Sequence, residues 1–86
     1  MYEVLVSNEA EKYYRKQDQD AKRRLGKCID ALSREPIFGQ HTKRLHGELE
    51  GKYRYRMGSI RIVYEVDIEN KTVKVKAIKS RGDSYK

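Results

Sequence analysis

Residues 52–78 alternate between apolar and polar or charged side chains, and this period of two constrains the fold more than any other feature of the sequence. The alternation is interrupted at Gly58–Ser59 and again in the segment DIENKT around Glu69–Asn70. Successive side chains of a β-strand point to opposite faces of the sheet, and a two-residue loop that begins with glycine is typical of a type II′ hairpin. The pattern therefore predicts three consecutive antiparallel strands joined by two tight turns.

The two turns also predict which residues lie opposite one another, because a hairpin loop sets the register of its strands. The predicted pairs are Arg56–Arg61, Arg54–Val63, Glu65–Lys74, Val63–Lys76 and Arg61–Ile78. One face of the sheet is then the core face, with Tyr53, Tyr55, Met57, Ile60, Ile62, Tyr64, Val66, Val73, Val75 and Ala77. The opposite face, the open face, holds Arg54, Arg56, Arg61, Glu65, Lys74 and Lys76, with Val63 and Ile78 among them.

The start of the chain is expected to form a strand and a short helix. Residues 2–6 are mostly β-forming side chains. Asn8, followed by Glu11 three residues later, matches a capping box, and apolar residues follow at helical spacing. We therefore expect a helix over about residues 8–16.

A second helix is predicted over residues 19–34, where the apolar side chains fall on one helical face. Asp18 is its expected N-cap, and Pro36 ends it, because the residue before a proline avoids the helical conformation. The connection 37–51 contains three glycines and a candidate short strand near Lys43–Leu45. The order β-α-α-β-β-β predicts an α+β fold in which a helix hairpin packs on a mainly antiparallel four-stranded sheet.

Length and composition narrow the class of protein. A chain of 86 residues is expected to form one domain, 1–86. The single cysteine, Cys28, excludes an internal disulfide and gives no metal-binding spacing, so neither a metal nor another cofactor is expected. No apolar run approaches the roughly 18–20 residues that span a membrane, and no signal peptide is visible. The expected location is therefore the cytoplasm.

The net charge of +7 is concentrated in the second half of the chain. Residues 43–86 contain 12 of the 20 lysines and arginines but only 6 of the 13 acidic residues. This half is a candidate surface for a polyanion or for an acidic protein.

The arginines of the predicted hairpin point to a more specific role. Like charges directly opposite one another destabilise a sheet, yet Arg56 is predicted to face Arg61. Arg81 follows Ile78 by three residues and would lie off the same end of the sheet. Guanidinium groups bind phosphate in a bidentate fork and can stabilise charge that develops in a transition state. The sequence therefore indicates an anion site, with a solvated basic face as the alternative.

The stretches LHGELEGKYRYRMGSIRIVYEV and SRGDSY resemble the RelE/ParE toxin superfamily, and the RelE-like mRNA interferases in particular. The resemblance implies a toxin of a type II toxin–antitoxin pair. It implies a ribosome-dependent endoribonuclease that cuts mRNA without a metal, by attack of the RNA 2′-OH on the adjacent phosphate. Its products would be a 2′,3′-cyclic phosphate and a 5′-OH. The implied partners are a cognate antitoxin, the ribosome and mRNA.

The same resemblance assigns the candidate site residues. The implied catalytic residues are Arg54, Arg56, Arg61, Arg81 and Tyr85. Arg61 is expected to hold the phosphate, Arg81 to act on the leaving-group side, and Tyr85 to stack on a splayed base. Lysines on and beside the same face are expected to bind RNA, namely Lys52, Lys74, Lys76 and Lys79. Positions 54 and 56 often carry lysine in the family. Because arginine is a poor general base, catalysis here either relies on electrostatics and ribosomal orientation or is weak or altered.

Two other functions remain open at the level of sequence. A ParE-like toxin shares the fold but inhibits DNA gyrase and needs no catalytic cluster. A non-enzymatic RNA-binding module would use the basic face alone. In either toxin, the antitoxin is expected to be an acidic or amphipathic segment that covers the basic face or the helix pair.

Several conspicuous side chains are expected to be structural. Cys28 lies on the apolar side of the second predicted helix, and Tyr13, Tyr14, Tyr53 and Tyr55 are expected in the core. His41 and His46 lie in the glycine-rich connection, where an acid–base role is the less favoured interpretation.

Overall fold

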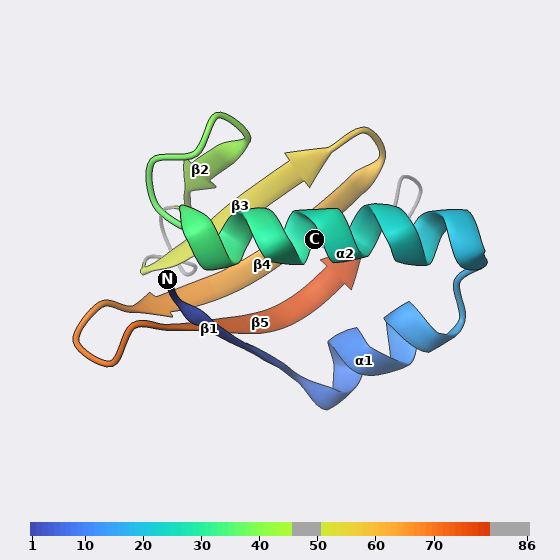
Figure 1. Ribbon diagram of the computed structural model, residues 1–86, viewed down its shortest axis with the longest axis horizontal. Coiled ribbons are helices and arrows are strands. Elements are labelled where there is room, and N and C mark those ends of the chain that lie inside the picture. The colour runs from blue at the N-terminus through green and yellow to red at the C-terminus, as the bar shows by residue number, and fades with distance from the viewer. Residues whose placement is uncertain (46–50, 80–86) are drawn as a thin grey trace.

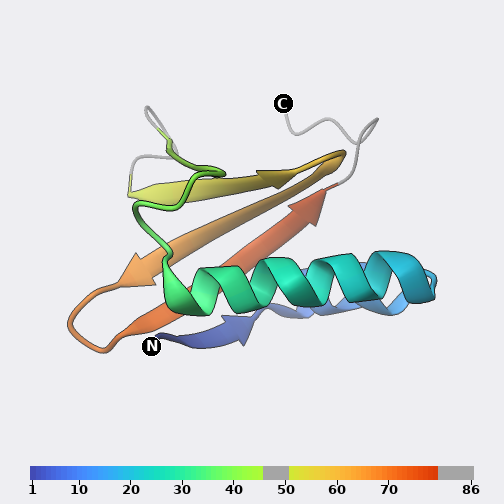
Figure 2. The same cartoon turned by 45° about the horizontal axis from the view of Figure 1, so that its top comes forward.

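The structure is a computed structural model that describes residues 1–45 and 51–79. Its elements, in chain order, are β1 (Glu3–Val6), α1 (Asn8–Arg15), α2 (Gln19–Arg34), β2 (Thr42–Arg44), β3 (Lys52–Met57), β4 (Ile60–Asp67) and β5 (Thr72–Lys79). The sheet has the strand order β1-β5-β4-β3-β2. Both helices lie on one side of the sheet, and its other face is not covered by them (Figure 1 and Figure 2). The predicted α+β fold of a helix pair on a mainly antiparallel sheet is confirmed.

The sheet of the described residues has five strands instead of the four predicted. The additional strand, β2, lies in the connection where a short strand was a candidate, and it pairs with β3 in antiparallel fashion. It was difficult to predict because it has only three residues, all of them polar or charged. Its edge position matters for the site, because it adds Lys43 to the open face opposite Arg54.

Strand β1 pairs with β5 in parallel, so that Val4 lies beside Val73. Adjacent parallel strands need a long crossover connection between them. Here that connection includes both helices as well as the β2–β4 region, and α1 and α2 cover the core face. Neither helix of the described residues is long and apolar enough to cross a membrane.

The helix ends follow the capping rules, with one correction. The N-cap of α1 is Ser7, whose Oγ accepts a hydrogen bond from the backbone N–H of Ala10 (3.1 Å), and Asn8 is the first helical residue. The serine also donates to the carbonyl oxygen of Lys76 (2.8 Å), which ties α1 to β5. The predicted capping box at Asn8 is therefore wrong by one residue, because the tertiary contact favours Ser7. The predicted cap of α2 is confirmed, since Asp18 Oδ1 accepts from Ala21 N–H (2.8 Å).

The core lies between the helices and the sheet. Its buried residues are Ala10, Leu25, Cys28, Leu32, Tyr55, Ile60, Ile62, Tyr64, Val73, Val75 and Ile78. The core positions predicted for Cys28 and Tyr55 are confirmed, and Tyr13 and Tyr53 pack against the core while half-buried. The prediction for Tyr14 is wrong, because this side chain is 39% exposed and lies under the ammonium of Lys22.

The predicted register of the β3–β4 hairpin is confirmed, with Arg56 opposite Arg61 and Arg54 opposite Val63. In the β4–β5 pair, Glu65 faces Lys74 as predicted, but a β-bulge beside Val63 and Tyr64 then shifts the register by one residue. The predicted partners Val63–Lys76 and Arg61–Ile78 are therefore wrong. The observed partners are Val63–Ala77 and Arg61–Lys79.

The bulge also exchanges two residues between the faces. Ile78, predicted on the open face, is 4% exposed and belongs to the core. Ala77, predicted in the core, is half-buried and lies opposite Val63 on the open face. The cause is the extra residue, Lys76, between Val75 and Ala77 on β5, since a bulge places two residues against one and changes which side chains face the core.

Candidate functional site

The register of the sheet arranges the open face in three rows. The Arg56 row consists of Arg56, Arg61 and Lys79, on β3, β4 and β5. The Arg54 row consists of Lys43, Arg54, Val63 and Ala77. The Lys52 row consists of Lys52, Glu65 and Lys74. Directly opposite residues are about 5 Å apart at Cβ, so each row is a line of neighbouring side chains.

The Lys52 row alternates in charge, as stable sheets usually do. Glu65 lies between two lysines of neighbouring strands and forms an ion pair with a third, Lys76, at 3.2 Å from Nζ to Oε1. Opposite charges on directly opposed positions stabilise a sheet. This end of the open face is therefore close to electrostatic balance.

In the Arg56 and Arg54 rows, by contrast, side chains of the same charge lie opposite one another. Arg56 faces Arg61, Arg61 faces Lys79, and Lys43 faces Arg54. Each of these is a like-charge pair, an arrangement that is unfavourable between directly opposed residues of a sheet. The same face of one sheet thus has opposite charges paired at one end and like charges opposed at the other. An anion bound at the Arg56 and Arg54 rows would meet several cationic donors on one face.

Arg54 also has a donor that the described part of the chain leaves without a hydrogen-bond partner. Its Nε atom is buried, although the residue as a whole is only half-buried. Buried N–H groups without partners cost free energy, so they are uncommon in folded proteins. A guanidinium offers five donors in a fork that suits phosphate.

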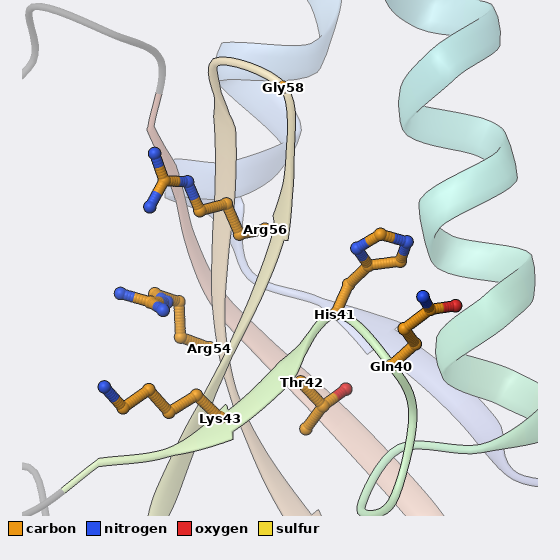
Figure 3. A pocket seen from close by; sticks show the side chains of 7 residues that line it. All are labelled: Gln40, His41, Thr42, Lys43, Arg54, Arg56 and Gly58. Atoms are coloured by element: carbon orange, nitrogen blue, oxygen red, sulfur yellow. The ribbon is translucent and has the colours of Figure 1, made fainter.

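Two hollows adjoin these cations. One, of about 380 Å3, is lined by Arg56, Gly58, Ser59 and Arg61, and so lies between the two opposed arginines. The other, of about 590 Å3, is lined by Gln40, His41, Thr42, Lys43, Arg54, Arg56 and Gly58. Figure 3 shows Lys43, Arg54 and Arg56 pointing to the same side of the strands. Gly58 has φ of 58°, a conformation that favours glycine and keeps the hairpin turn tight.

His41 borders the larger hollow but does not join the cations. Its imidazole packs edge-on against Tyr55, with ring centroids 5.7 Å apart, and Figure 3 shows it pointing away from Lys43, Arg54 and Arg56. Its contribution to the site is through the backbone, since its carbonyl oxygen accepts a hydrogen bond from Arg56 N–H (3.0 Å). An acid–base role for His41 stays the less favoured interpretation.

A buried tyrosine anchors the edge of the site. The hydroxyl of Tyr64 donates to the Pro36 carbonyl oxygen (2.6 Å) and lies 3.3 Å from Thr42 Oγ1. Burial raises the pKa of this phenol to about 12, so it remains a neutral donor. These contacts hold the loop after α2 and the start of β2, and β2 in turn positions Lys43.

The structure brings together Arg54, Arg56, Arg61 and Lys79 of the predicted site. Lys52, Lys74 and Lys76 share the open face, but they surround Glu65 at the opposite end. Arg81, Tyr85 and His46 lie outside the described residues, so their roles remain predictions. The sequence analysis did not include Lys43 in the site. The candidate short strand near Lys43–Leu45 would have placed Lys43 there if it had been paired with β3, because Lys43 lies opposite Arg54.

Comparisons with known proteins agree with this fold. Residues 4–85 match the family model of the ParE toxin of the type II toxin–antitoxin system parDE. Toxin RelG of Mycobacterium tuberculosis is 38% identical over 55 residues, which cover 64% of this chain and 61% of RelG's own length.

One chain in each of two solved complexes has the same fold over almost its whole length. The RelBE2 toxin–antitoxin complex of M. tuberculosis matches with a TM-score of 0.84 and 28% identity, over 93% of this chain and 98% of that one. The archaeal RelE–RelB complex of Pyrococcus horikoshii OT3 matches with a TM-score of 0.80 and 27% identity, over 96% of this chain and 98% of that one. The chain therefore belongs to the ParE toxin family, within the RelE/ParE superfamily of type II toxin–antitoxin toxins.

Proposed function

We propose that this toxin is an mRNA interferase, an endoribonuclease that cuts mRNA positioned on the ribosome. The observation that carries the proposal is the reversal of charge pairing on the open face. Three like-charge pairs lie at one end, whereas the other end has matched charges. Several guanidinium and ammonium groups gathered on one face supply the donors that a phosphodiester needs.

The proposed reaction needs no metal or cofactor. The 2′-oxygen of the RNA forms a bond to the adjacent phosphorus, and the bond from phosphorus to the 5′-oxygen breaks. The 2′-hydroxyl proton leaves to water, and the 5′-oxygen takes up a proton, so that the products are a 2′,3′-cyclic phosphate and a 5′-OH. Negative charge grows on the non-bridging oxygens, and donors placed beforehand at those oxygens lower the barrier.

The roles of the residues follow from their places. Arg61 lies in the middle of the Arg56 row and is the proposed principal phosphate ligand, with Arg56 beside it. Arg54 is one alternation step along β3 on the same face, so it can hold the phosphate from the side. Since arginines remain protonated, they supply charge and orientation while the ribosome positions the 2′-OH. Arg81 on the leaving-group side and Tyr85 as a stacking residue complete the proposal.

The lysines of the site extend the contact with RNA. Lys79 and Lys43 flank the arginines, whereas Lys52, Lys74 and Lys76 would meet the backbone at the other end of the open face. Lysines that neutralise phosphates add affinity that weakens as salt rises. The proposed place of action is the cytoplasm, where the ribosome and mRNA are found.

A second candidate function is inhibition of DNA gyrase, and the observation that favours it is the match to the ParE family model over residues 4–85. Both functions require a cognate antitoxin, and the two solved complexes are toxins bound to antitoxins. This chain has an apolar groove of about 400 Å3 at the helix pair, and an amphipathic antitoxin segment could bind in it. That groove is lined by Val6, Glu11, Tyr14, Leu25, Gly26, Ile29 and Ile78.

The deciding experiment compares both activities in one preparation. Toxin separated from its antitoxin is added to ribosomes programmed with mRNA and, separately, to a gyrase supercoiling reaction. We expect mRNA cleavage with a 2′,3′-cyclic phosphate end, its loss in Arg61→Ala, and unchanged supercoiling. Gyrase inhibition with intact mRNA would reject the interferase and establish the second candidate.

A further inference from the structure

The β-bulge in β5 decides which residues of this strand reach the cationic end of the open face. From Val73 to Lys76, the odd-numbered residues Val73 and Val75 are buried and the even-numbered Lys74 and Lys76 are exposed. After the bulge the pattern reverses, so that Ile78 is buried and Lys79 is half-buried opposite Arg61. Continued alternation without the bulge would have placed Lys79 on the core side and Ile78 beside the arginines.

Bulges are found preferentially beside functional sites, where they redirect a side chain. Here the redirected side chain is a cation that joins two others in the Arg56 row. No acidic side chain of the described residues forms an ion pair with Lys79, whereas the bulge residue Lys76 is paired with Glu65 at 3.2 Å. The local structure therefore places Lys76 against a carboxylate and Lys79 beside Arg61.

We propose that Lys79 is a third donor to the phosphate held by Arg56 and Arg61, and that the bulge is the element that positions it. This inference rests on the proposed function and adds a residue to the same site. An ammonium is a compact charge on a flexible stem, so it can follow a non-bridging oxygen as the geometry at phosphorus changes. Lys79 thus acts at the phosphate that reacts, in addition to the general attraction of RNA to a basic face.

The test compares Lys79→Gln with Lys71→Gln. Lys71 is exposed in the turn before β5, at the far end of that strand from Lys79, so both variants lose one positive charge from the same hairpin. Single-turnover cleavage at saturating ribosome is expected to fall about 10- to 100-fold in Lys79→Gln, the range for losing one hydrogen bond to a charged group. Lys71→Gln should cleave at the parental rate. Lys79→Arg should recover most of the loss, because it restores a charged donor.

A second measurement does not depend on catalysis. Inorganic phosphate is titrated into each variant while the backbone amide signals of the β3–β4 hairpin are followed by NMR. Weaker phosphate binding in Lys79→Gln than in Lys71→Gln is expected. If the two variants match in both cleavage and phosphate binding, Lys79 has no special role and the inference is overturned.

The role of Lys79 and the endoribonuclease activity can be rejected independently of each other. If Arg61→Ala cleaves like the parent, the proposed function fails, and the phosphate titration still tests Lys79. If Arg61→Ala loses cleavage while Lys79→Gln behaves like Lys71→Gln, the inference alone fails. Thermal melting checks that every variant is folded. If Lys79→Gln is unfolded, Lys79→Thr replaces it, because threonine favours β-strands.

Discussion

Arg56→Ala should make the toxin slower and, at low salt, more stable. Arg56 is exposed, lines both hollows of the site and lies directly opposite Arg61. In the proposed function, its removal takes away one donor to the phosphate and at the same time one half of a like-charge pair. A residue that serves only the fold would not give opposite signs in these two measurements.

The two magnitudes follow from the geometry. Loss of one donor aimed at developing charge costs on the order of 100- to 1000-fold in rate. A directly opposed cross-strand pair contributes about 0.2–1 kcal/mol, so relief of repulsion should raise the free energy of unfolding by a few tenths of a kcal/mol. In a domain of this size that corresponds to a rise of about 1–4 °C in Tm. The gain should vanish near 1 M salt, where the Debye length is only about 3 Å.

The assay is single-turnover cleavage of mRNA on saturating ribosomes, together with thermal melting at low and high salt. Arg24→Ala is the matched control, because it removes the same charge from an exposed position on α2, on the helix side of the sheet. We expect Arg24→Ala to cleave at the parental rate. The reasoning is refuted if Arg56→Ala cleaves as fast as Arg24→Ala, or if it melts lower at low salt and is inactive only because it unfolds.

Four further predictions concern the scaffold and the partner surface. Tyr64→Phe should lower the free energy of unfolding by about 1–3 kcal/mol in chemical denaturation, because it leaves the Pro36 carbonyl without its buried donor. Stability should also fall as pH rises from about 9 toward 12, and we would measure it by denaturant titration across that range. Burial raises the pKa of the Cys28 thiol from 9.0 to about 11 and that of Tyr64 from 10.0 to about 12, so the folded state holds protons that the unfolded state releases first. A flat profile would contradict this, and Tyr64→Phe should reduce the slope. Gly26→Ala should raise the Tm of the free toxin, by the equivalent of roughly 0.5–1 kcal/mol, because a Cβ there meets no atom within 4 Å. Gly26→Leu should weaken antitoxin binding in calorimetry if an antitoxin helix occupies the groove, and unchanged affinity would place the antitoxin elsewhere.

The sequence was sufficient to predict the parts of the fold that depend on local pattern. The β3–β4 hairpin follows from strict alternation and a glycine-first turn, so its register and the opposition of Arg56 to Arg61 were predicted correctly. Helix α2 follows from one apolar face between Asp18 and Pro36, and its observed bounds agree. These elements are local, because neighbouring residues determine them.

The errors arise where distant contacts decide. Strand β2 has three polar residues, and it forms because β3 offers a free edge and Tyr64 holds the preceding loop. The N-cap of α1 is Ser7 because its hydroxyl also donates to Lys76 on β5. Counting residues from a turn assumes an unbroken ladder, so it does not detect the bulge that places Ile78 in the core and Lys79 beside Arg61.

The bulge links the stability of this protein to the geometry of its site. Ile78 packs into the core and lines the apolar groove at the helix pair, while Lys79, its neighbour, lies in the Arg56 row. The burial of one apolar side chain therefore helps to hold a lysine in a repelling line of cations, because the two residues are adjacent on one strand and point to opposite faces. Burying an isoleucine contributes about 1.5–3 kcal/mol, which exceeds the repulsion of a single opposed pair. The hydrophobic core can thus hold Lys79 opposite Arg61, and in the proposed function a phosphate would bind between these cations.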